Sequence, residues 1–68
     1  MTKKESKLLV DHIIGDMIIA NHKFSEGKIS SETYKAVLIC NRDLANCFIK
    51  NKDDYNSFRF WYEKYQTV

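Results

Sequence analysis

Residues Ser25-Glu26-Gly27-Lys28-Ile29-Ser30-Ser31-Glu32 form a helix end followed directly by a helix start. Gly27 is the residue type that most often ends a helix in the left-handed conformation. Ser30 is a favourable N-cap, and Glu32 would lie in the first turn, where the helix dipole favours a carboxylate. Because the connection is so short, the two flanking helices must fold back on each other as an antiparallel hairpin.

The residues before this turn predict one long helix over residues 3–25. Thr2 and Glu5 have the spacing of a capping box, which places the helix start near Lys3. Apolar residues then recur at helical spacing and form one broad core face. They are Leu9, Val10, Ile13, Ile14, Met17, Ile18, Ala20 and Phe24.

A second helix is predicted over residues 31–50. Its expected core face is Tyr34, Val37, Cys40, Leu44, Cys47 and Phe48, flanked by Ala36 and Ala45. Cys40 and Cys47 would lie about 10 Å apart along the axis, too far to form a disulfide with each other. We therefore interpret them as small buried apolar residues in a reducing compartment.

A short aromatic helix is predicted over residues 54–66, capped by the segment Asn51-Lys52-Asp53-Asp54. Its apolar stripe is Tyr55, Phe58, Trp61, Tyr62 and Tyr65. Alternating aromatic residues over 58–62 also fit a strand, but a lone strand would leave its backbone unpaired. The sequence thus predicts one all-α domain over residues 1–68, a long antiparallel hairpin plus a short third helix, alone or in a dimeric bundle.

Composition narrows the function classes. The 68 residues include 11 Lys+Arg and 9 Asp+Glu, a balance unlike the strongly basic one of a dedicated nucleic-acid binder. Asp11, His12 and Asp16 interrupt the first apolar helix, so we expect no membrane span and a cytoplasmic location. Abundant Lys, Asn, Ile, Tyr and Phe indicate an AT-rich genome, such as that of a bacteriophage or mobile element.

No motif predicts a catalytic, cofactor-binding or metal site, so we expect a protein that is not an enzyme. His12 and His22 lie ten residues apart, whereas zinc needs about four closely spaced ligands. Ser30 and Ser31 are assigned to the start of the second helix, so we do not interpret either as a catalytic nucleophile. The histidines are interpreted as surface residues.

Some apolar residues fall outside the expected core faces. Leu8 and Ile19 lie opposite the core face of the first helix, with Gly15 between them. A glycine there costs about 1 kcal/mol of helix propensity but allows another helix to approach closely. Ile39 points away from the second helix's core face, whereas Leu38 and Ile49 stand at its margin. These residues pack under the third helix, contact a second chain or have no role, since scattered exposed apolar residues are normal.

Two asparagines fall within the apolar arcs of the long helices. A buried asparagine is costly unless it is paired, and its best-attested use is to fix the register between helices. We hypothesise that Asn21 and Asn41 set pairing specificity, either within the hairpin or between protomers.

The sequence therefore favours a small non-catalytic regulatory or inhibitory protein that binds another protein, with a homodimer as the economical way to bury its surplus apolar residues. The candidate partner-binding residues are Leu8, Gly15, Ile19, Ile39, Arg42, Arg59, Phe60 and Trp61. For the third helix, core filling is the competing interpretation.

Two other function classes stay open. One is a nucleic-acid-binding regulator, which would use the lysines that an antiparallel hairpin gathers at one end. These are Lys3, Lys4, Lys7, Lys50 and Lys52; a surface of Lys35, Arg42 and Asn46 is the alternative. The other is a structural or assembly subunit.

Overall fold

The computed structural model describes residues 2–66, and the predicted helices form in the predicted order. Helix α1 spans Lys3–Ser25, α2 spans Ser31–Phe48 and α3 spans Lys52–Gln66. The all-α fold is confirmed, and so is the helical interpretation of residues 58–62. The second helix ends earlier than predicted and the third begins earlier, because Asn51 Oδ1 accepts hydrogen bonds from the backbone N–H groups of Asp53 and Asp54 (2.9 and 3.1 Å).

The signals at the helix ends act as the sequence predicts. The Thr2 N–H donates to Glu5 Oε1 (3.0 Å), and the Glu5 N–H donates to Thr2 Oγ1 (3.2 Å). The backbone bond from Thr2 stabilises the carboxylate and lowers the pKa of Glu5. Ser30 Oγ accepts from the Thr33 N–H (3.1 Å), and Gly27 has a φ of 75°. The turn therefore forms as expected.

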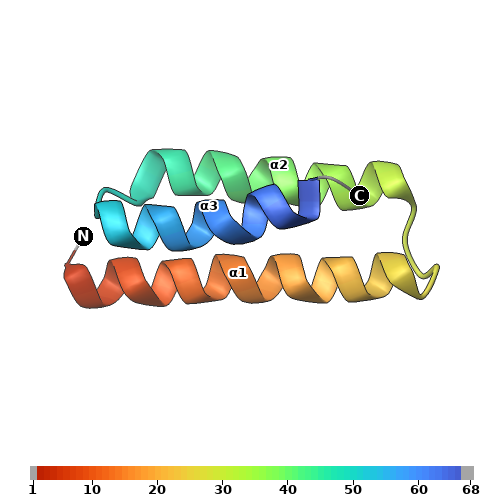
Figure 1. Ribbon diagram of the computed structural model, residues 1–68, viewed down its shortest axis with the longest axis horizontal. Coiled ribbons are helices and arrows are strands. Elements are labelled where there is room, and N and C mark those ends of the chain that lie inside the picture. Colours follow the sequence, from red (N-terminus) through yellow and green to blue (C-terminus); the bar gives the residue numbers. More distant parts are fainter. Residues whose placement is uncertain (1, 67–68) are drawn as a thin grey trace.

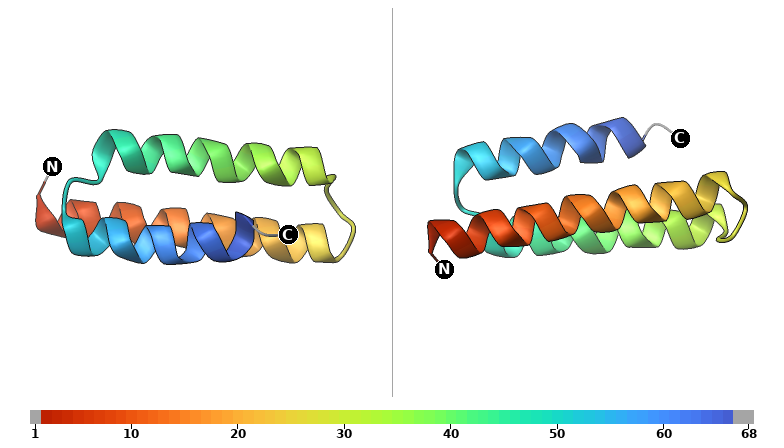
Figure 2. Two further views of the ribbon diagram at one scale, coloured as in Figure 1. Left: turned by 45° about the horizontal axis from the view of Figure 1, so that its top comes forward. Right: turned by 90° about the horizontal axis from the view of Figure 1, so that it is seen from below.

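The helices pack as a bundle with principal extents of 37 × 17 × 16 Å. Helix α2 runs antiparallel to α1, and α3 returns antiparallel to α2 and parallel to α1 (Figures 1 and 2). Helix α3 contacts both others, and its contact with α1 is the more extensive. One side of the α1–α2 pair is consequently left uncovered. None of the described helices is long and apolar enough to cross a membrane.

The core lies along the line where the helices meet. Phe58, Ile13 and Met17 are its largest fully buried side chains. The aromatic stripe of α3 faces this core, with Tyr55, Trp61 and Tyr62 half-buried against it. Phe24 and Tyr34 stack with their ring centroids 4.8 Å apart, which closes the core near the turn. Within the predicted core face of α1, Ile18 is the exception, because it is 40% exposed.

The predicted core face of α2 is wrong by roughly a quarter of a helical turn. The buried residues of this helix are Tyr34, Leu38, Asn41 and Ala45, followed by Ile49 just after it. The residues assigned to the core but found exposed are Ala36, Cys40, Leu44, Cys47 and Phe48. The physical reason is the position of α3, which packs against the Leu38 flank of α2 and turns the opposite flank toward solvent.

Both asparagines pair within one chain. Asn41 is 4% exposed, and its Nδ2 donates to Asp16 Oδ2 (2.8 Å) and to the Val37 carbonyl oxygen (3.0 Å). Asn21 Nδ2 donates to the Tyr34 hydroxyl (3.1 Å), which donates to the Tyr65 carbonyl oxygen (3.4 Å). Both asparagines therefore connect α1 to α2 within the single chain, whereas their role in setting pairing specificity stays a prediction.

Candidate functional surfaces

Large apolar side chains remain on the surface of the single chain. Among residues 2–66, those at least 40% exposed are Leu8 (59%), Ile18 (40%), Ile19 (56%), Ile39 (45%), Leu44 (41%), Phe48 (50%) and Phe60 (64%). Leu8, Ile19, Ile39 and Phe60 were expected outside the core faces, and α3 does not cover them. Single exposed apolar residues are common, so their grouping is what carries information.

One group lies on the uncovered side of α1 and α2. On α1, residues 8, 12, 15 and 19 are spaced four, three and four apart, so they share one face. On α2, residues 40, 44 and 47 follow the same spacing. We call these seven residues the hairpin face: Leu8, His12, Gly15, Ile19, Cys40, Leu44 and Cys47.

The two stripes of the hairpin face belong to one surface. A shallow hollow of about 150 Å³ joins them, because Ile19 and Lys23 of α1 line it together with Thr33 and Val37 of α2. Thr33 and Val37 continue the α2 stripe at the same spacing. None of the five residues of the α2 stripe, Thr33, Val37, Cys40, Leu44 and Cys47, is charged. The α1 stripe, by contrast, has Glu5 near one end and Lys23 near the other.

A second surface is the α2–α3 groove, which consists of two adjoining hollows of about 310 and 180 Å³. Arg42, Tyr62 and Gln66 line both. The larger hollow is completed by Lys35, Leu38 and Ile39, and the smaller by Tyr55, Phe58, Arg59 and Glu63. The groove thus combines apolar walls with several cationic side chains.

The arginines of the groove have carboxylate neighbours. Arg42 Nη2 lies 3.6 Å from Asp43 Oδ1, and Arg59 Nε donates to Glu63 Oε1 at 2.7 Å. All four side chains are substantially exposed, so solvent screens these pairs and each contributes little to stability. The guanidinium groups therefore keep donors available for a ligand.

Phe60 and Trp61 differ in their surroundings. Phe60 is 64% exposed and meets Trp61 edge-to-face with ring centroids 5.6 Å apart. Trp61 is half-buried against the core, and Lys64 Nζ lies 4.9 Å from its ring centroid. The predicted partner-binding set is thus divided among the hairpin face (Leu8, Gly15, Ile19), the α2–α3 groove (Ile39, Arg42, Arg59) and the third helix (Phe60, Trp61).

Sequence reasoning missed the contribution of α2 to the hairpin face. Cys40, Leu44 and Cys47 were assigned to the core because their helical spacing is that of a buried stripe. The absence of charge along this stripe was the available signal, and it does not distinguish a core from an interface.

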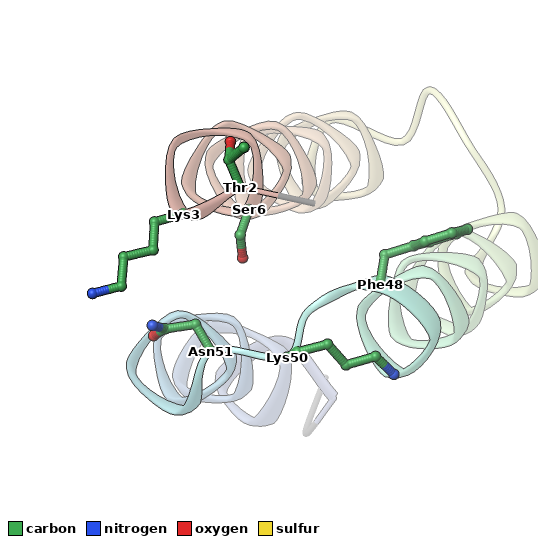
Figure 3. A pocket seen from close by; sticks show the side chains of 6 residues that line it. All are labelled: Thr2, Lys3, Ser6, Phe48, Lys50 and Asn51. Carbon is green, nitrogen blue, oxygen red and sulfur yellow. The ribbon is translucent and has the colours of Figure 1, made fainter.

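The lysine end of the bundle has a hollow of about 290 Å³, lined by Thr2, Lys3, Ser6, Phe48, Lys50 and Asn51. Figure 3 shows the side chains of Lys3 and Lys50 extending to opposite sides of the bundle end. Ser6 Oγ donates to Asp54 Oδ2 (3.0 Å), so a carboxylate shares this end. Lys3 and Lys50 therefore do not converge on one phosphate position.

Within the described part of the chain, no three His, Cys, Asp or Glu side chains gather as a metal site would require. No protein-family model matches the sequence, no curated protein matches it, and no solved structure matches the chain.

Proposed function

We propose that this chain is a small non-catalytic regulatory or inhibitory protein that binds another protein through the α2–α3 groove. Its composition and small size suit a bacteriophage or mobile-element accessory factor, and its two free, exposed cysteines suit a reducing cytoplasm. The observation that carries the proposal is the pairing of an apolar hollow, formed by Leu38, Ile39 and Tyr62, with Arg42 at its rim. Tyr and Arg are residue types that dominate binding hot spots.

The charge of the groove specifies the partner's chemistry. Lys35, Arg42 and Arg59 line it against one acidic side chain, Glu63, so the groove carries excess positive charge. An acidic amphipathic helix complements this surface, because its apolar residues would enter the hollows while its carboxylates meet the guanidinium groups.

The nucleic-acid alternative is less favoured by the contacts at the same surface. The side-chain oxygen of Asn46 accepts a hydrogen bond from the Tyr55 hydroxyl (2.7 Å), so it is already used within the bundle. The formal net charge of +2 is also far from the strongly basic balance of a dedicated nucleic-acid binder. Phosphate binding would also weaken by roughly one log unit per log unit of salt for each contact.

The test is comparative capture from an extract of the source cells. We expect immobilised wild-type protein to retain one protein that Ile39→Ser and Arg42→Glu retain about tenfold less or not at all. Ile18→Ser is the matched control, because Ile18 is similarly exposed (40% against 45%) but lies on α1. Equal capture by all variants would contradict the proposal, and so would a nuclease-sensitive ligand that salt removes.

A further inference from the structure

We infer that the hairpin face binds a second copy of this chain in an antiparallel, two-fold symmetric arrangement whose axis passes between Cys40 and Cys47. The seven residues of the hairpin face are absent from the α2–α3 groove. Self-association and partner binding therefore use different surfaces and fail independently.

The uncovered side is large enough for such an interface. One side of a three-helix bundle carries roughly a third of the 4837 Å² of accessible surface, about twice the ~800 Å² that one partner contributes to a standard interface. Leu8, Ile19 and Leu44 are 59%, 56% and 41% exposed on this side. The charge-free stripe of α2 would pack without burying an unpaired charge.

Symmetry makes the α1 stripe complementary to itself. In an antiparallel two-fold pair, the residues of one helix meet those of the other in reversed order about the axis. With the axis midway between Leu8 and Ile19, Leu8 of one copy meets Ile19 of the other. The same axis places Glu5 near Lys23, so apolar groups meet apolar groups and opposite charges meet at both ends.

Gly15 fits the same arrangement. In the single chain a Cβ at this position would meet nothing within 4 Å, and Gly27 is the glycine with positive φ. Packing within the single chain therefore does not require a glycine at position 15, although glycine inside a helix lowers stability relative to alanine. Across the proposed axis Gly15 lies opposite His12 of the second copy, where the missing side chain makes room for the imidazole.

The cysteines of α2 locate the axis independently. The Asn41–Asp16 hydrogen bond shows that these two residues lie level in the hairpin. Three residues toward the C-terminus of α2 and toward the N-terminus of α1, Leu44 therefore lies level with Ile13. The midpoint of Cys40 and Cys47 and that of Leu8 and Ile19 therefore fall at the same level. An antiparallel pair about this level brings Cys40 of one copy opposite Cys47 of the other, and both thiols are free and exposed.

Disulfide trapping tests this register. The oxidant diamide takes up two electrons and two protons as a Cys40 thiol of one copy and a Cys47 thiol of the other form one disulfide. We expect a disulfide-linked dimer from the wild type, none from Cys40→Ser alone or Cys47→Ser alone, and one again when these two variants are mixed. A single variant that cross-links as well as the mixture, or a wild type that does not cross-link, would overturn the inference.

Sedimentation of the reduced protein tests the face itself. Gly15→Ala should raise the urea midpoint of the dilute protein yet weaken self-association by about tenfold or more, because the methyl group meets the opposing imidazole. Ile19→Ser should also weaken it, whereas Ile18→Ser and the groove variant Ile39→Ser should not. A monomeric mass for the wild type at concentrations up to about 1 mM would exclude the dimer, and so would stronger association of Gly15→Ala.

Discussion

Asn41 is the buried polar residue that connects the two long helices. Its amide group donates to Asp16 across the hairpin and to the Val37 carbonyl within α2. Both acceptors have other partners available, since Asp16 is exposed and the Val37 carbonyl can accept the helical backbone bond. The side chain therefore contributes more to the register than to the net free energy of unfolding.

Replacing Asn41 separates these two contributions. We expect Asn41→Leu to raise the free energy of unfolding by about 1 kcal/mol, because the gain from burying an apolar side chain exceeds the lost hydrogen bonds. It should also produce a second set of amide resonances, as the α1–α2 register becomes less unique. Asn41→Ala, the matched control, should lower stability in urea unfolding. A leucine variant less stable than the alanine variant would contradict this account.

At the scale of the elements, the helix ends are set by local contacts. Asn51 Oδ1 accepts from two backbone N–H groups at the start of α3, which would otherwise be unpaired. This cap explains why α3 begins at Lys52 and why the connection from α2 is short.

The same helix offers a matched pair of asparagines. We expect Asn51→Ala to lower the free energy of unfolding by about 1 kcal/mol, the usual contribution of an N-cap. Asn56→Ala should raise it by a few tenths of a kcal/mol, since Asn56 is exposed inside α3 and alanine is the better helix former. Thermal and urea unfolding followed by helical circular dichroism would measure both. Equal effects of the two substitutions would show that Asn51 does not act as a cap.

At the scale of the whole molecule, stability depends on a few large side chains. A chain of this size buries roughly 60% of its unfolded surface and is therefore only marginally stable. Phe58 is 1% exposed at the meeting point of the helices, whereas Phe60, two residues away, is 64% exposed. Phe58 should thus contribute far more than Phe60 to the free energy of unfolding.

Phe58→Ala should cost about 3–5 kcal/mol, which is comparable to the entire stability of so small a domain. We expect this variant to lose most of its helical circular dichroism at 25 °C. Phe60→Ala should remain folded, with a change within about 0.5 kcal/mol. A folded Phe58→Ala protein with an unchanged urea midpoint would show that the core described here is not what stabilises the chain.

The helices and the hairpin could be predicted from the sequence because their signals are local. Thr2, Gly27 and Ser30 act on backbone groups within a few residues of themselves, so their effects require no knowledge of the rest of the chain. Apolar spacing likewise identified most of the core face of α1 and the aromatic face of α3. The same periodicity placed Leu8, Ile19, Ile39 and Phe60 outside the core faces, but it left open whether α3 would cover them.

The orientation of α2 and the grouping of the surface residues depended on tertiary packing. The apolar arc of α2 is wider than the core can cover, and periodicity does not tell which part α3 will bury. The register of the hairpin then placed Leu44 level with the midpoint of the α1 stripe. The sequence of one helix determines its apolar arc, but only contact with the other helices determines which part of that arc is buried.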